Sequence, residues 1–287
     1  MIALTEKLTH KEKFQIISEL KSSYGRTSLL LSGGGQLGIY HFGFIKQLVE
    51  HKIMPKVIAG SSAGSIIAAG VGCLKKEELL RRIKYSDWVI KDFPNTSWLL
   101  VPLFLIMRII TNGGSLLTIE GVRQIMNDSI GDITFMEAFH KTGYILNVTV
   151  SDPNKFESFK VLNYLTAPNV LVRSAVTTSC SMPLLMGAST VMCKNEFGSI
   201  VEWLPGKKMF IDGCIDADLP KRRISEMFNT NYSIASQANP YVIPFMSRSK
   251  YNLSSKWFFL WKLYEYFAYF IYSEIQHRSR QLVQTGL

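Results

Sequence analysis

The sequence predicts a three-layer α/β/α fold, in which helices cover both faces of a mostly parallel central sheet. Two observations lead to it. A short apolar run at Thr27–Ser32 is followed by a helical pattern at Tyr40–Glu50, and the same order returns with Lys56–Gly60 and Ser61–Gly72. Strands that alternate with helices favour a parallel sheet, because each crossover packs against a face of the sheet before the next strand pairs. The 287 residues, 47% of them hydrophobic, are enough to bury one such core.

The first segment of the chain predicts a helix that leads into this domain. Within Thr5–Lys21, three apolar side chains lie at helical spacing among polar neighbours: Phe14, Ile17 and Leu20. We therefore expect residues 1–25 to form a helical lead-in and residues 26–250 to form the main domain.

The remainder of the domain continues the alternation of helices and strands. Helices are predicted at Lys75–Val89, Thr118–Asn127, Thr134–His140 and Leu171–Ser179. Strands are predicted at Gly143–Val150, Lys208–Asp212, Tyr232–Ser236 and Tyr241–Phe245. No internal repeat interrupts these segments, which favours a single domain.

The composition bears on partners and location. The formal net charge of +10 suits an anionic surface, but the basic residues are dispersed, so we expect no nucleic acid as a partner. The first 24 residues hold no apolar signal-peptide core, and no run reaches the roughly 18 apolar residues that a spanning helix needs. The four cysteines form no C-x-x-C pair, which favours reduced thiols. The expected location is the cytoplasmic side.

Residues 60–64 read Gly-Ser-Ser-Ala-Gly, a G-x-S-x-G motif between a predicted strand and a predicted helix. In a nucleophile elbow the serine sits on a strained turn, and small residues such as Gly60 and Gly64 avoid clashes around it. The following helix points its N-terminus at the serine, which favours developing negative charge. The context makes Ser62 the candidate nucleophile, although a helix start rich in small residues is the alternative.

A glycine loop precedes this motif at residues 33–38, Gly-Gly-Gly-Gln-Leu-Gly. Successive amides of Gly33, Gly34, Gly35 and Gly38 can point at an anion, such as the oxyanion of an acyl-transfer reaction. The loop also fits the dinucleotide-binding pattern G-x-G-x-x-G, which expects an acidic residue at the end of the next strand. That strand ends in Ala59-Gly60-Ser61 instead, which weakens an oxidoreductase interpretation.

A third motif, Asp212-Gly213, ends the strand predicted at Lys208–Asp212. An Asp-Gly turn alone is common, so it gains weight only as the third member of the ordered set. Asp216 and Asp218 follow closely, but Gly213 favours a turn over a continued strand. We therefore predict no metal, and expect these two carboxylates to be turn residues or partners of Lys221 and Arg222.

The order G-G-G-x-x-G, G-x-S-x-G and D-G resembles the patatin-like phospholipase family. Further stretches are similar to its triacylglycerol lipases of fungi and plant oil bodies: residues 22–35, 162–170, 174–183, 212–220, 231–240 and 276–278. The resemblance implies a patatin-like fold and a Ser–Asp dyad without a catalytic histidine or a cofactor. By position, Ser62 would be the nucleophile and Asp212 the base, with Gly33–Gly35 and Gly38 forming the oxyanion loop.

The implied activity is hydrolysis of a lipid acyl ester through an acyl-enzyme intermediate, with a neutral lipid or phospholipid as substrate. Three alternatives remain. His277 follows Asp212, so a Ser–His–Asp triad has the right chain order. Lysophospholipid acyltransferases occur in the same family. A lipid-binding protein without catalysis is the alternative outside the enzyme class.

Two aromatic or apolar stretches suggest how the chain reaches a lipid. Residues 251–287 contain the stretch Trp257–Tyr272, in which ten residues are aromatic, with polar residues on one side of the predicted helix. Trp and Tyr favour the boundary between water and acyl chains, so we expect a helix lying in an interface. Trp98–Ile110 is a second candidate contact, with Arg108 reaching headgroups. The expected partner is a lipid droplet or membrane surface; burial of both stretches in the core is the alternative.

Overall fold

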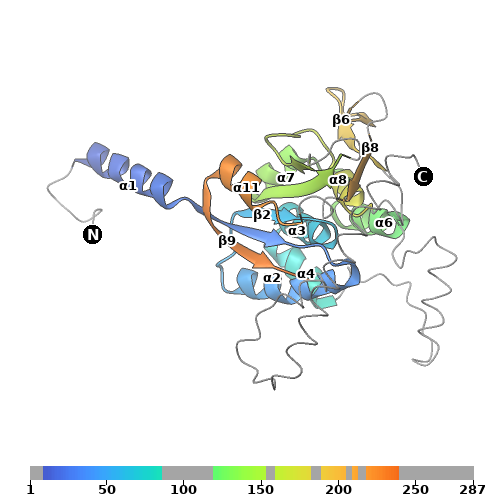
Figure 1. The fold of residues 1–287 in the computed structure, drawn as a ribbon, viewed down its shortest axis with the longest axis horizontal. Coiled ribbons are helices and arrows are strands. Elements are labelled where there is room, and N and C mark those ends of the chain that lie inside the picture. Colours follow the sequence, from blue (N-terminus) through green and yellow to red (C-terminus); the bar gives the residue numbers. More distant parts are fainter. Residues whose placement is uncertain are drawn as a thin grey trace, which may run out of the picture.

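The computed structural model describes residues 9–85, 119–152, 159–181, 189–204, 209–212 and 218–238 (Figure 1). Its centre is a seven-stranded sheet with the order β5-β8-β3-β2-β1-β9, in which β4 also pairs with β3. The strands of this sheet are β1 (Arg26–Leu31), β2 (Val57–Gly60), β3 (Ile145–Ser151), β4 (Phe159–Leu162), β5 (Ser189–Thr190), β8 (Met209–Asp212) and β9 (Thr230–Ser236). A separate antiparallel pair is formed by β6 (Met192–Lys194) and β7 (Ile200–Glu202).

The sheet is parallel on one side and antiparallel on the other. β9, β1, β2 and β3 are neighbours in parallel register, whereas β4 and β8 pair with β3 in the antiparallel sense. The carboxyl ends of β1, β2 and β3 therefore lie at one edge of the sheet. In an open parallel sheet this edge is where ligands usually bind.

The helices, in chain order, are α1 (His10–Tyr24), the 3-10 helix η2 (Gly35–Ile39), α2 (Tyr40–Glu50), α3 (Ala63–Cys73), α4 (Lys76–Tyr85), α6 (Ile119–Ile130), α7 (Phe135–Thr142), α8 (Val172–Ser179) and α11 (Lys221–Phe228). Successive strand residues point to opposite faces, so β1 sends Leu29 and Leu31 into one core and Leu30 into another. The first core includes residues of α2, α3, α6 and α8, and the second includes Ile224 and Phe228 of α11. The predicted three-layer fold is confirmed.

Local signals explain where several helices begin and end. Thr134 caps α7, because its side chain accepts a hydrogen bond from the Glu137 amide. The Glu137 carboxylate in turn accepts a hydrogen bond from the Thr134 amide. The helix ends at Gly143, which adopts a left-handed conformation (φ 70°). Our prediction that a strand begins at Gly143 was therefore wrong: β3 begins at Ile145, after the glycine has ended the helix.

The predicted N-terminal helix is present, but it begins and ends later than Thr5–Lys21. Thr9 caps α1 through a capping box with Glu12, and the helix continues to Tyr24 before Gly25 ends it. α1 extends away from the sheet (Figure 1) and has no buried residue. The three apolar side chains named above are exposed: Phe14, at 75%, Ile17 and Leu20.

Several elements were not predicted: β4, β5, the β6–β7 pair, the 3-10 helix η2 and α11. The last of these follows Pro220 and has Lys-Arg-Arg in its first turn, so its apolar positions, Ile224 and Phe228, are sparse. Several predictions lie outside the described residues, namely the strand Tyr241–Phe245 and the stretches Trp98–Ile110 and Trp257–Tyr272. Within the described part of the chain, no helix has the length and apolar character needed to cross a membrane.

Candidate active site

Ser62 stands at the turn between β2 and α3, where the backbone is strained. Its φ is 49° and its ψ is −126°, a combination that residues with a side chain rarely adopt. The flanking glycines explain how the turn closes. A Cβ on Gly60 would lie 2.4 Å from the carbonyl oxygen of Gly64, and one on Gly64 would lie 2.4 Å from that of Leu31. The G-x-S-x-G motif thus forms a nucleophile elbow because only glycine fits at both positions.

The glycine loop lies against this elbow. A Cβ on Gly38 would come within 2.7 Å of the Cβ of Ala63, the residue that follows Ser62. The Ser61 amide donates to the carbonyl of Leu31, the last residue of β1. The loop after β1 and the elbow after β2 are therefore adjacent at the carboxyl edge of the sheet, as acyl-transfer chemistry requires.

A polar network holds the start of the glycine loop. The Gly33 amide donates to Asp218 Oδ1 at 2.6 Å, and Gln237 Nε2 donates to Asp218 Oδ2 at 3.2 Å. Ser32 Oγ donates to the Gly33 carbonyl and accepts from the Ala238 amide. Since the Gly33 amide is engaged by a carboxylate, this residue anchors the start of the loop.

His41 belongs to the same network and is buried. Its Nε2 lies 3.1 Å from the Ser32 carbonyl oxygen and its Nδ1 lies 2.8 Å from Ser236 Oγ. A carbonyl only accepts, so Nε2 carries the proton and Nδ1 accepts from the Ser236 hydroxyl. Burial lowers the pKa of His41, an effect opposed by the Ser32 carbonyl and the charge of Asp218. The neutral imidazole therefore braces β1 against β9.

Asp212 is fully buried at the end of β8. It pairs with Val150 of β3, while Gly60 of β2 pairs with Val148 two residues earlier. Ser62 comes two residues after Gly60, so the serine and the aspartate flank β3 at the same level. Their backbones are separated by two strand spacings, roughly 10 Å. The negative charge of Asp212 adds to burial in raising the pKa of the Cys180 thiol, which places Cys180 near the carboxylate.

The C-terminal end of α8 contacts both positions. Ser179 Oγ accepts the amide of Ser62 at 2.9 Å, and the Ser181 carbonyl accepts the amide of Asp212 at 2.9 Å. Thr149 Oγ1 of β3 also donates to Ser61 Oγ at 2.7 Å. One short segment therefore fixes the backbone of the candidate nucleophile relative to that of the candidate base.

The structure brings most of the predicted residues to one edge of the sheet: Ser62, Gly60, Gly64, Gly33, Gly34, Gly35, Gly38 and Asp212. Gly213 lies outside the described residues. Asp218, which we expected to be a turn residue or a partner of Lys221 and Arg222, lies in a bend and accepts from Gly33 and Gln237, while Arg222 pairs with Glu226.

Sequence reasoning missed two residues of the site. Asp218 gives only a weak signal, its place six residues after Asp212 and two before Pro220. Ser179 lies in residues 174–183, which are similar to triacylglycerol lipases, but this similarity predicts no role for Ser179. Both act across more than 100 residues of sequence, so no local pattern reveals their contacts.

Comparison with known proteins found a matching family model and several similar sequences. A family model described as "Patatin-like phospholipase" matches residues 29–220. The chain is similar to "Triacylglycerol lipase SDP1L" of Arabidopsis thaliana, with 36% identity over 99% of this chain and 36% of that protein. It is 39% identical to "Triacylglycerol lipase ptl3" of Schizosaccharomyces pombe, over 84% of this chain and 51% of that protein.

A third relative is "Triacylglycerol lipase 4" of Saccharomyces cerevisiae, which is 40% identical over 82% of this chain and 26% of that protein. The chain therefore spans between about a quarter and a half of the length of these curated relatives.

Proposed function

Since the chain belongs to the patatin-like phospholipase family, we propose that it hydrolyses lipid acyl esters with Ser62 as nucleophile and Asp212 as base. The observation that supports this most is the left-handed backbone of Ser62 at a strand–helix turn that only glycines can flank. Such a turn lifts the serine hydroxyl above the sheet edge, where a substrate carbonyl can approach.

In the first half of the reaction, Ser62 Oγ attacks the carbonyl carbon of the ester. The serine proton passes to the Asp212 carboxylate as the bond forms. The tetrahedral intermediate then collapses and expels the alcohol, which takes the proton from Asp212. The fatty acyl group stays on Ser62 as an ester.

The oxyanion of the intermediate needs hydrogen-bond donors that are already in place. α3 begins at Ala63, so the Ala63 amide is among those at a helix N-terminus that have no acceptor in the helix. The amides of Gly34 and Gly35 lie in the loop that packs on the same turn. Each such donor typically contributes about 3 kcal/mol to transition-state stabilisation. We assign these three amides to the oxyanion and Gly33 to anchoring the loop.

In the second half, water replaces the serine as nucleophile. Asp212 accepts a proton from the water as it attacks the acyl carbonyl, and the proton returns to Ser62 when the fatty acid leaves. The buried position of Asp212 supports this role, because it keeps the proton transfer apart from bulk water.

A Ser–His–Asp triad has less support. Of the four histidines in the described residues, His41 uses both ring nitrogens in structural contacts and the others are exposed: His10, His51 and His140. A triad would therefore depend on His277, which lies outside the described residues.

Site-directed variants test the dyad. Ser62→Ala should abolish both ester hydrolysis and labelling by a fluorophosphonate, whereas Ser61→Ala, its neighbour, should still be labelled. Asp212→Asn should lower kcat by about a hundredfold or more, the usual effect of removing a general base. His277→Gln should keep most of its activity. An inactive His277→Gln together with an active Asp212→Asn would establish the triad instead.

Relatives that carry the name triacylglycerol lipase make triacylglycerol the first substrate to test, against steryl esters and phospholipids. We propose that the protein meets this lipid at a droplet or membrane surface on the cytoplasmic side. Turnover of each lipid class in emulsions and vesicles by the purified chain would rank the substrates; turnover of phospholipid alone would overturn the triacylglycerol assignment.

A further inference from the structure

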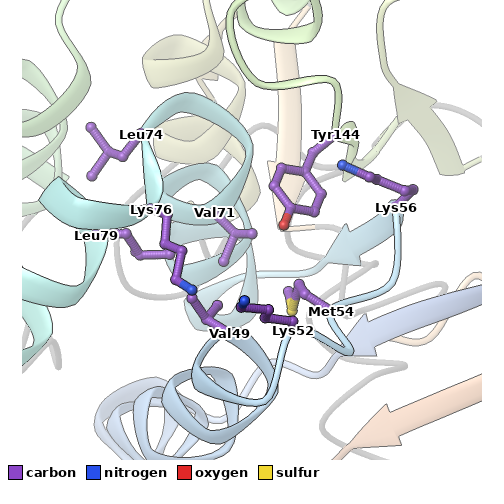
Figure 2. A pocket seen from close by; sticks show the side chains of 9 residues that line it. All are labelled: Val49, Lys52, Met54, Lys56, Val71, Leu74, Lys76, Leu79 and Tyr144. Carbon is purple, nitrogen blue, oxygen red and sulfur yellow. The ribbon is translucent and has the colours of Figure 1, made fainter.

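A hollow lies near the amino ends of β2 and β3, between α2, α3 and α4 (Figure 2). Its volume is about 230 Å³. Lys56, which lines it, immediately precedes β2, whereas Ser62 follows the end of that strand. The length of β2, roughly 13 Å at the usual rise per residue, therefore separates this hollow from the candidate active site. A ligand bound here would not touch the nucleophile.

The floor of the hollow is apolar. It consists of Val49 of α2, Val71 of α3, and Leu74 and Leu79 around the start of α4. All four are at least nine-tenths buried and belong to the larger hydrophobic core. This floor favours an apolar group over a fully hydrated ion, because it offers no hydrogen bond to replace those made with water.

The rim of the hollow is basic. Lys52 and Lys76 approach it from opposite sides, with their ammonium groups turned toward one another above Val49 (Figure 2). A third cation, Lys56, lies over the Tyr144 ring at 4.5 Å. Two like charges that converge repel each other, and an anion placed between them removes that repulsion.

No carboxylate among the described residues neutralises this rim. None lines the hollow, and none forms an ion pair with the three lysines. Glu50 and Glu78, which lie on the neighbouring turns, pair with Lys46 and Arg82. Glu77 follows Lys76 in sequence but does not line the hollow. The rim therefore keeps positive charge for a ligand.

Lys52 is held in an unusual backbone conformation. It follows α2 with φ at 59°, and the amides of Lys52 and Ile53 close the helix end on Val49 and Leu48. Glycine is the usual residue at such a helix end, because a side chain is disfavoured at positive φ. Replacing this lysine by glycine should therefore relieve the backbone while it removes the whole Lys52 side chain, including the ammonium group.

We propose that this hollow binds a fatty-acid anion, with its carboxylate between Lys52 and Lys76 and its first methylenes on the apolar floor. The hollow is smaller than the roughly 300–1,000 Å³ of sites that enclose drug-sized ligands, which suits one chain rather than a two-chain lipid. A single-chain phosphate shares this chemistry. The site is independent of Ser62, so its test does not depend on the proposed hydrolysis.

The test is photo-crosslinking of the purified chain with a decanoic acid that carries a diazirine on its alkyl chain. Peptides that contain residues 49–54 or 71–79 should be labelled. Lys52→Gly and Lys76→Gln should each reduce this labelling by roughly tenfold or more, the loss expected for one charge-assisted hydrogen bond. Lys46→Gln, a change on α2 at a lysine that pairs with Glu50, should be labelled like the wild type.

Two controls are competition by unlabelled ligands and the melting temperature of the Lys52→Gly variant. Unlabelled decanoate should displace the probe, and decanol, which lacks the charge, should not. Decyl phosphate that competes better than decanoate would overturn the choice of a carboxylate. Lys52→Gly should melt at or above the wild-type temperature, so its lost labelling cannot be ascribed to unfolding. Labelling confined to other peptides, or unchanged in Lys52→Gly, would overturn the site.

Discussion

At the scale of single residues, the site depends on one strained backbone. Ser62 has a positive φ, which costs roughly 1–2 kcal/mol for a residue with a side chain. Hydrogen bonds at both the amide and the carbonyl of Ser62 hold this conformation. Its amide donates to Ser179 Oγ, and its carbonyl accepts from the amide and the hydroxyl of Ser65. The strain therefore stays at the position where the hydroxyl must project.

The glycine at the second flank of the elbow should tolerate no side chain. Gly64→Ala would press a methyl group against two backbone carbonyls, those of Leu31 and Ser32. We expect a loss of about 1–3 kcal/mol in the free energy of unfolding, the usual cost of overpacking. Gly43→Ala is the matched control, because nothing lies within 4 Å of its new Cβ on α2 and alanine should add about 1 kcal/mol. Urea denaturation measures both; equal stability of the two variants would refute the steric account.

Asp218 should matter through the loop that it anchors. Asp218→Ala removes the acceptor of the Gly33 amide, and we expect kcat to fall by about tenfold or more, with KM changing less, because such hydrogen bonds contribute roughly 1.5–3 kcal/mol. Asp218→Asn keeps an oxygen for the same amide and should restore most of the rate. Steady-state kinetics on a soluble ester separates kcat from KM. If the asparagine variant is as slow as the alanine variant, the hydrogen bond to Gly33 is not what matters.

At the scale of elements, the end of α8 connects the turn after β2 with the end of β8. Ser179→Ala should leave the Ser62 amide without its acceptor and slow acylation by fluorophosphonate, at a stability cost of about 1–3 kcal/mol. Ser181→Ala is the matched control. Its hydroxyl donates only to Thr177, and its contact with Asp212 is made by the backbone carbonyl, which the variant retains. Equal labelling rates in the two variants would exclude a positioning role for Ser179.

The buried His41 between β1 and β9 should make the free energy of unfolding depend on pH. The pKa of His41 is lowered from 6.5 in the folded state, so below this pH the unfolded chain binds a proton that the folded chain refuses. The contribution of His41 is therefore complete above pH 6.5 and is lost as the pH falls, by at most about 1.4 kcal/mol per pH unit. Unfolding free energies of the wild type should fall between about pH 7 and pH 5 more steeply than those of His41→Gln. Parallel curves would contradict a buried neutral imidazole.

At the scale of the whole molecule, the sheet accounts for the order of the motifs along the chain. β1 and β2 are parallel neighbours, so the loops that follow them meet, and β8 reaches the same edge from the antiparallel side. The basic, slightly apolar composition, with a mean hydropathy of +0.12, suits a protein that works against a lipid surface.

The proposed contact with that surface is the aromatic stretch at residues 257–272, which lies outside the described residues. Replacing Trp257, Phe258 and Trp261 by Ser should reduce flotation with liposomes or droplets, because Trp and other large apolar side chains bind at the lipid boundary. Phe197→Ser removes another exposed aromatic, 90% accessible next to β7, and should float like the wild type. Circular dichroism must show both proteins folded. Undiminished flotation would exclude this stretch as the anchor, and unfolding would favour a place for it in the core.

The sequence by itself determined the local features of this protein. Hydrophobic periodicity placed β1, β2, α2 and α3 near their observed bounds, and the glycine chemistry of residues 33–38 and 60–64 indicated a loop and an elbow. These features are predictable because each depends on residues only a few positions apart, such as the close contact between Gly60 and Gly64.

The tertiary structure alone decided which distant residues complete the site. Asp218 reaches Gly33 across 185 residues, and Ser179 reaches Ser62 across 117. Asp212 comes level with Ser62 only through the register of β8 on β3 and of β3 on β2. Such pairings depend on the crossovers and on the order of the strands, and no local sequence pattern predicts either. Their free energy comes from packing between segments that are far apart in sequence, which forms only after the connecting loops have closed.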